Sequence, residues 1–118
     1  MNARGWSSFP TPFTQRRNSV GEHEIVVFAD LDLLLAPQVE EAAVAALGGH
    51  PSRLILDLST VAFVDSAGLA AVLHISRIAE ERRCPFGVFP PPASVHKVFE
   101  IAGLADVLTW LSPADRRR

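Results

Sequence analysis

The stretch LILDLSTVAFVDSAGL, residues 54–69, combines the end of an apolar strand with the start of an amphipathic helix. Residues 53–58 are mostly apolar around a single Asp57, which predicts a buried β-strand. A helix is predicted from Ser66 to about residue 83, because apolar residues recur there at helical spacing. Ser66 therefore lies at the junction, where its hydroxyl is exposed at the positive end of a helix dipole. Such a position suits a modified side chain better than a packing residue.

Strand and helix patterns alternate along the rest of the chain. The other predicted elements are an edge strand at 13–17, a turn at 18–21, a buried strand at 24–29, a helix from Pro37 to Gly48, a short strand at 86–89, a helix at 93–101 and a short strand at 107–111. The buried stripe of the 66–83 helix is predicted to contain Leu69, Val72, Leu73, Ser76 and Ala79. This order predicts an α/β fold whose helices pack on a mixed sheet of four to five strands, with an antiparallel hairpin first. Sites in such folds gather at the carboxyl ends of strands, where Asp65 and Ser66 lie.

The size and charge of the chain limit the class of protein. Its 118 residues suffice for one domain, predicted to span 13–111, with a flexible arm at 1–12 and a polar tail at 112–118. The formal net charge of -2 argues against a nucleic-acid binder. A single cysteine, Cys84, excludes an internal disulfide and a cysteine-based metal site. Since no apolar run is long enough for a signal peptide or a membrane span, we expect a cytoplasmic protein without membrane association.

Three blocks of sequence, in order, resemble the STAS domains of the anti-sigma factor antagonist type. VFADLD at 27–32 is similar to the strand and Gly-Glu-Leu-Asp of that family. The segment 56–69 is similar to its most specific signature, a strand leading into Asp-Ser-Ala-Gly-Leu or Asp-Ser-Ser-Gly-Leu. VHKVFEIAGL at 95–104 is similar to its third helix and the Gly-Leu after it. The resemblance covers almost the whole chain and implies the STAS fold.

The resemblance also implies a function and a set of site residues. In that family the unphosphorylated protein binds an anti-sigma factor, often itself a serine kinase, and so releases a sigma factor; a phosphatase reverses the modification. The phosphorylated serine corresponds to Ser66, so the chain is expected to be a binding module, not an enzyme, with neither cofactor nor metal. The expected partner-binding residues are Asp30, Asp32, Asp65, Ser66, Ala67 and Gly68. Asp65 can equally be only the cap of the helix, Asp30 and Asp32 can be ordinary loop carboxylates, and Gly68 is better explained by close packing.

The chain departs from the family pattern at three places. Ala29 and Asp30 replace the glycine and glutamate of the family, which can change the shape of that loop or the choice of partner. Three prolines at 90–92 stiffen the connection before the third helix. The C-terminal helix is truncated to residues 112–115, and an apolar face left open by its loss could be covered by a second copy in a homodimer.

Other function classes have weaker support in the sequence. His74 lies eight residues beyond Ser66, ~12 Å along one helix, which is too far for a Ser–His dyad. Asp57 lies inside a strand, unlike a phosphorylated aspartate beside a magnesium site, and no paired carboxylates follow the first strand. A STAS domain can also serve as an adaptor in another assembly, such as a stressosome-like scaffold, an anion transporter or a phospholipid-trafficking complex. These assemblies differ in their partners, which the sequence does not name.

Overall fold

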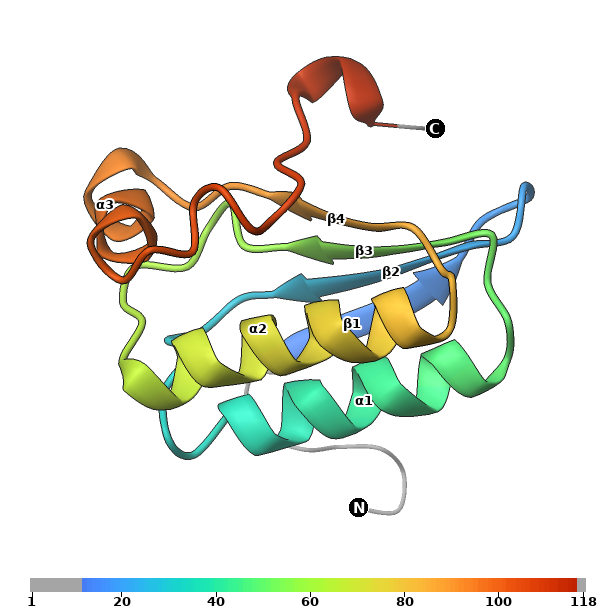
Figure 1. The fold of residues 1–118 in the computed structure, drawn as a ribbon, viewed down its shortest axis with the longest axis horizontal. Coiled ribbons are helices and arrows are strands. Elements are labelled where there is room, and N and C mark those ends of the chain that lie inside the picture. Colours follow the sequence, from blue (N-terminus) through green and yellow to red (C-terminus); the bar gives the residue numbers. More distant parts are fainter. Residues whose placement is uncertain (1–11, 117–118) are drawn as a thin grey trace, which may run out of the picture.

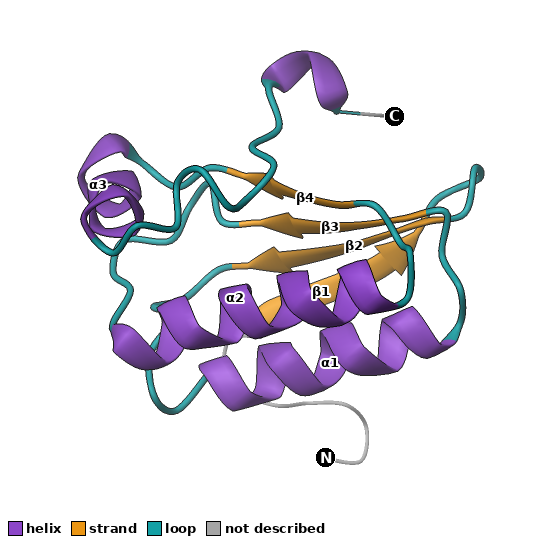
Figure 2. Ribbon diagram, in the orientation of Figure 1, coloured by secondary structure: helices purple, strands orange, loops and turns teal. Residues whose placement is uncertain are grey.

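The computed structural model describes residues 12–116. The strands are β1 (Phe13–Arg17), β2 (Glu22–Val27), β3 (Arg53–Asp57) and β4 (Phe86–Phe89), and the helices are α1 (Ala36–Gly48), α2 (Ser66–Glu81) and α3 (Ala93–Ile101). The strands form one sheet in the order β1-β2-β3-β4, in which β1 and β2 are antiparallel and the later pairs are parallel. Helices α1 and α2 lie side by side on one face of the sheet, and α3 lies beyond the ends of the strands (Figures 1 and 2). The predicted α/β fold with an initial hairpin is confirmed.

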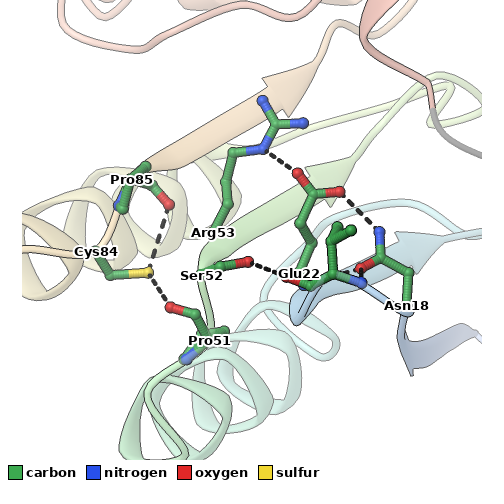
Figure 3. Close-up of polar contacts among 8 residues, drawn as sticks. Asn18, Glu22, Pro51, Ser52, Arg53, Cys84 and Pro85 are labelled. Carbon is green, nitrogen blue, oxygen red and sulfur yellow. Dashed lines mark hydrogen bonds and ion pairs between the residues drawn. The ribbon is translucent and has the colours of Figure 1, made fainter.

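Polar contacts fix the hairpin end of the sheet (Figure 3). The Asn18 side chain accepts hydrogen bonds from the backbone N–H of Val20 and Glu22 and donates one to the Glu22 carboxylate at 2.7 Å. Gly21, with φ of 82°, completes the turn predicted at 18–21. The Arg53 guanidinium donates to the buried Glu22 carboxylate at 3.0 Å and so joins β3 to the hairpin. These contacts hold the strands in register at the end of the sheet opposite Ser66.

Cys84 belongs to the same end of the sheet (Figure 3). Its thiol donates to the backbone oxygens of Pro51 and Pro85. Burial raises the pKa of the Cys84 thiol above its ordinary value, against a smaller opposing effect of the Leu54 backbone. The thiol therefore stays protonated at neutral pH and fills space between two loops.

The main core lies between the sheet and the two parallel helices. The alternate residues of β2 and β3 that face the helices, among them Ile25, Val27, Leu54 and Leu56, are almost fully buried. The predicted stripe of α2 was only partly right: Val72 and Ala79 are buried, but Leu69, Leu73 and Ser76 are half-buried and Ile75 is buried instead. The first half of α2 is apolar nearly all round, so helical spacing alone did not determine which side faces the sheet.

The strand predicted at 107–111 was wrong. A single bridge joins Trp110 to Val88, and residues 104–108 form a turn in which Val107 is exposed. The backbone N–H of Val88 donates to Thr109 at 2.9 Å, and the N–H of Leu111 donates to Val88 at 2.8 Å. The turn consumes the residues that a longer strand would need. In the described residues the sheet therefore has four strands, and β2 begins and ends two residues earlier than predicted.

Residues 110–116, which we call the C-terminal strap, lie on the side of the sheet opposite α1 and α2 (Figure 1). Leu111 packs with Ile55 and Phe89 in a small second core and lies over Gly87, where a Cβ would come within 2.7 Å of the leucine. A short 3-10 turn, Pro113–Asp115, stands in place of the C-terminal helix. Arg116 then returns to the sheet, where its Nη1 donates to the Asp57 Oδ2 at 2.9 Å. The other two residues of the predicted tail, like residues 1–11 of the predicted arm, lie outside the described residues.

Arg116→Ala is expected to lower the free energy of unfolding at neutral pH by about 1 to 2 kcal/mol, because it leaves the buried Asp57 carboxylate without its guanidinium. Burial alone would raise the pKa of Asp57, but hydrogen bonds from Ser59 and the Arg116 guanidinium outweigh it and place this pKa below the ordinary value. A lowered folded-state pKa stabilises the protein above the unfolded pKa, and this contribution is lost on acidification. Urea unfolding of both proteins should therefore show the difference at neutral pH and a smaller one well below about pH 4. Arg77→Ala on α2 is the control, and an equal difference at both pH values would contradict the assignment.

Candidate functional site

Ser66 is the first residue of α2, and its side chain is exposed. Asp65 caps the helix in an extended conformation, with φ of -107° and ψ of -173°. Its Oδ1 accepts the backbone N–H of Gly68 at 3.0 Å, and its Oδ2 accepts the backbone N–H of Leu33 at 3.1 Å. The carboxylate therefore caps α2 and also ties the loop before α1 to it. The hydrogen bonds of the Asp65 carboxylate therefore fix the position of Ser66.

The loop between β2 and α1 forms a single unit with the loop between β3 and α2. Leu31 and Val64 make a parallel bridge, in which the backbone N–H of Leu31 donates to the Phe63 oxygen at 3.0 Å. The Asp32 Oδ1 accepts the backbone N–H groups of Leu34 and Leu35, each at 3.1 Å. The predicted proximity of these two loops is present in the structure, and they meet beside Asp65, the residue before Ser66.

Gly68 makes this junction possible. A Cβ on Gly68 would lie 2.1 Å from the Leu31 carbonyl oxygen and 2.6 Å from a methyl group of Val64. Only a glycine at this position lets the first turn of α2 approach the backbone of the neighbouring loop. Gly68 is buried, so its contribution to the site is this close packing.

The remaining predicted site residues differ in their surroundings. Asp30 is exposed in the loop after β2. Asp32 is half-buried, and its carboxylate accepts backbone hydrogen bonds within the same loop. Ala67 is half-buried beside Ser66. Asp30 and Ser66 are therefore the predicted residues most open to a partner.

Four exposed apolar residues lie in the two loops that meet beside Ser66, and their exposure was not predicted from the sequence. We call Phe28, Leu33, Leu34 and Phe63 the apolar rim; all four come from these two loops. Leu33 and Leu34 are 70% and 81% exposed, although Leu31 and Leu35 on either side are buried. Exposed apolar side chains gathered in one place are typical of a protein-binding surface. The signal in the sequence was Leu33-Leu34 in a segment without helical or strand spacing.

The site is acidic and apolar, and it lacks a catalytic arrangement among the described residues. No lysine or arginine occurs in residues 28–47 or 54–76, while Asp30, Asp32 and Asp65 lie in the two loops. His74, which the helical spacing places too far from Ser66 to act as its base, contacts Glu40 of α1. Within residues 12–116 no group of three His, Cys, Asp or Glu side chains could hold a metal ion. Asp57, which was considered as a phosphorylated aspartate, instead accepts a hydrogen bond from Arg116 on the opposite face of the sheet.

Comparisons with known proteins identify relatives in sequence and in fold. A family model described as "Mlab, STAS domain" matches residues 15–110. The anti-sigma-B factor antagonist of Listeria monocytogenes is 28% identical over 85 residues, which cover 72% of this chain and 75% of that protein. Among solved structures, an anti-sigma factor antagonist from Mycobacterium paratuberculosis has a TM-score of 0.76 at 23% identity, covering 87% of this chain and 86% of the other. The Bacillus cell fate determinant SpoIIAA in its phosphorylated form has a TM-score of 0.67 at 22% identity, covering 87% and 94%.

A membrane-spanning segment was not expected, and none of the helices within residues 12–116 has the length and apolar character to cross a bilayer.

Proposed function

The chain belongs to the STAS domain family. We propose that it is an anti-sigma factor antagonist, which binds an anti-sigma factor with serine kinase activity while Ser66 is unphosphorylated. Anti-sigma factor antagonists are non-enzymatic regulators, which agrees with the prediction of a binding module. In the proposed cycle, binding occupies the anti-sigma factor and releases a sigma factor. Phosphorylation of Ser66 ends the interaction, and a phosphatase restores it. The cycle requires a cytoplasmic protein and no cofactor.

The exposure of Ser66 at the start of α2 is the observation that carries this proposal. A phosphate there adds about −1.5 to −2 charge and three acceptor oxygens. The first turn of a helix supplies free backbone N–H groups and a favourable dipole, so the fold tolerates the phosphate. The related Bacillus SpoIIAA has been solved in a phosphorylated form, which supports the same modification here.

The surroundings of Ser66 supply both parts of a switchable surface. The apolar rim gives a partner apolar area to bury, and Asp30 adds a polar contact at its margin. A phosphate at the centre of such a surface must be desolvated on binding, and it lies next to the Asp65 carboxylate. Phosphorylation therefore acts on the complex and not on the fold.

The experiment that tests the proposal is phosphorylation by a purified anti-sigma factor kinase, recovered from native lysate on the immobilised protein. After incubation with ATP, mass spectrometry should place one phosphate on Ser66, and Ser66→Ala should stay unmodified. Ser94→Ala is the matched control, because Ser94 is another exposed serine in the first turn of a helix, α3. Phosphate on Ser94, or on no serine while a known substrate of the kinase is modified, would refute the assignment of Ser66.

A second candidate function is an adaptor in another STAS assembly, such as a phospholipid-trafficking complex. The observation that favours it is the matching family model, whose description names Mlab and not the antagonists. An adaptor should bind its partner with the same affinity whether residue 66 is serine, alanine or aspartate. Affinity measurements with these three variants separate the two functions.

A further inference from the structure

The face of the sheet opposite α1 and α2 holds a guanidinium in a defined position. The Nη1 of Arg116 donates to the Asp57 carboxylate at 2.9 Å, and the guanidinium lies over the Phe89 ring with Cζ at 4.0 Å from the ring centroid. Asp57 and Phe89 are both buried, and they are paired neighbours on β3 and β4. A fixed carboxylate beside an aromatic face is a binding position for a planar cation.

A cavity of about 390 Å³ adjoins this position, between the sheet and the C-terminal strap. Val26, Ile55 and Phe89 form its apolar part. Its charged lining residues are Glu22, Glu24, Asp57, Asp115, Arg16 and Arg116. Four carboxylates and two guanidinium groups thus line a space of the size that small-molecule sites have, and a further guanidinium, that of Arg53, pairs with Glu22. Because the strap brings Arg116 from outside the sheet, the cation position is filled by a tethered side chain.

We propose that this cavity binds a small compound bearing a guanidinium group and a second positive charge, and that Arg116 competes with it for the position over Phe89 and beside Asp57. The ligand guanidinium takes the place of the Arg116 side chain, and its second charge lies toward the Glu24 side of the cavity. The strap lies on the opposite side of the sheet from α2, which begins at Ser66, so the site does not depend on the function proposed for that residue.

The chemistry of the position favours a guanidinium over a simple ammonium. A guanidinium is planar, so it can stack on the ring while it donates to the carboxylate at its edge. It is also less strongly hydrated than an ammonium and costs less to remove from water. Asp57 keeps its charge at neutral pH because its hydrogen bonds with Ser59 and Arg116 hold its pKa low, although burial alone would raise it. Glu24 pairs with Arg16 at 3.0 Å, and Arg16 is mostly exposed and can turn away.

Competition from Arg116 sets the expected affinities. A side chain on a short tether has an effective concentration of about millimolar, so a weak ligand must displace it. We expect agmatine, which carries a guanidinium and an amine, to bind Arg116→Ala at least about twofold more tightly than the wild-type protein.

The test is an NMR titration of the full-length, isotope-labelled protein with agmatine at physiological ionic strength. The proposal expects saturable shifts of the backbone amides of residues 55–57 and 87–89, with the tighter binding in Arg116→Ala. Arg77→Ala on α2 is the matched control and should bind as the wild type does. Putrescine, an amine without the guanidinium, should bind Arg116→Ala more weakly than agmatine.

Removing either the Asp57 carboxylate or the Phe89 ring, the two groups that contact the ligand guanidinium, should abolish agmatine binding. Asp57→Asn combined with Arg116→Ala takes away the carboxylate, and Phe89→Leu combined with Arg116→Ala takes away the ring, which keeps the test valid if one double variant does not fold. The proposal is overturned if agmatine fails to saturate Arg116→Ala at about 10 mM, because a Kd above this concentration corresponds to very weak binding. Equal affinities for the wild type and Arg116→Ala, equal binding of putrescine, or shifts confined to other residues would overturn it as well.

Discussion

Ser66→Asp is expected to weaken binding to the anti-sigma factor by about a thousandfold relative to Ser66→Ala. The added carboxylate lies beside Asp65 and within the apolar rim, so binding must desolvate a new charge next to an existing one. A like-charge or desolvated contact of this kind costs several kcal/mol, which corresponds to about 10³ in affinity. The alanine variant should bind as well as the unmodified serine, because it removes a hydroxyl without adding a charge. Surface plasmon resonance with the purified anti-sigma factor measures both variants directly.

The same pair of substitutions at Ser94 controls for a general effect of charge. Ser94 is exposed in the first turn of α3, so Ser94→Asp adds the same charge at an equivalent place on another helix. It should leave the affinity almost unchanged. Ser66→Asp should also unfold at the temperature of the wild type or slightly above it, since an acidic residue in the first turn is favourable. A Ser66→Asp protein that binds as tightly as Ser66→Ala would exclude the switch at this residue.

Gly68→Ala is expected to destabilise the protein by about 3 kcal/mol or more. The added methyl group would lie 2.1 Å from the Leu31 carbonyl oxygen, so a backbone segment has to move. That segment also supplies the bridge to Val64 and the hydrogen bond to the backbone N–H of Asp65. Since these contacts shape the loop beside Ser66, a variant that still folds should bind the anti-sigma factor less tightly.

Gly48→Ala is the matched control for this substitution. Gly48 is also a helical glycine, at the end of α1, but no atom lies within 4 Å of the position of its added Cβ. It should stabilise the protein slightly, by about 0.5 kcal/mol, because alanine has less freedom to lose on folding. Urea unfolding curves of the two variants, compared with the wild type, measure both effects. If the free energy of unfolding of Gly68→Ala is no lower than that of Gly48→Ala, the junction accommodates the methyl group without strain.

Local signals in the sequence predicted the elements that position the site. The apolar run at 53–58 and the Asp-Ser pair before an amphipathic segment predicted the end of β3 and the start of α2. The hairpin followed from β-rich segments on either side of a short polar turn. In each case residues close in sequence determined the structure, because a strand pattern or a helix cap needs only its neighbours.

Features that depend on distant residues could not be predicted. The exposure of Leu33 and Leu34 depends on the bond between Leu33 and Asp65, which lie 32 residues apart. Likewise, nothing near Asp57 indicates that Arg116, 59 residues later, pairs with it. The buried side of α2 also depends on α1 and the sheet together, which is why Ile75 was overlooked. The loop at Ser66 was therefore predicted from the sequence, while the exposed apolar residues beside it were not.

The order of the strands has a consequence for how the chain folds. Each strand of the sheet pairs with the strand that precedes it in sequence, and in the two parallel pairs a helix lies between the partners. The parallel pairings are slow to form, but their order allows the chain to acquire structure progressively as it leaves the ribosome. The junction around Ser66 needs only β2, α1, β3 and the start of α2, whereas the strap arrives last. A nascent chain can thus complete the surface around Ser66 before the opposite face of the sheet is covered.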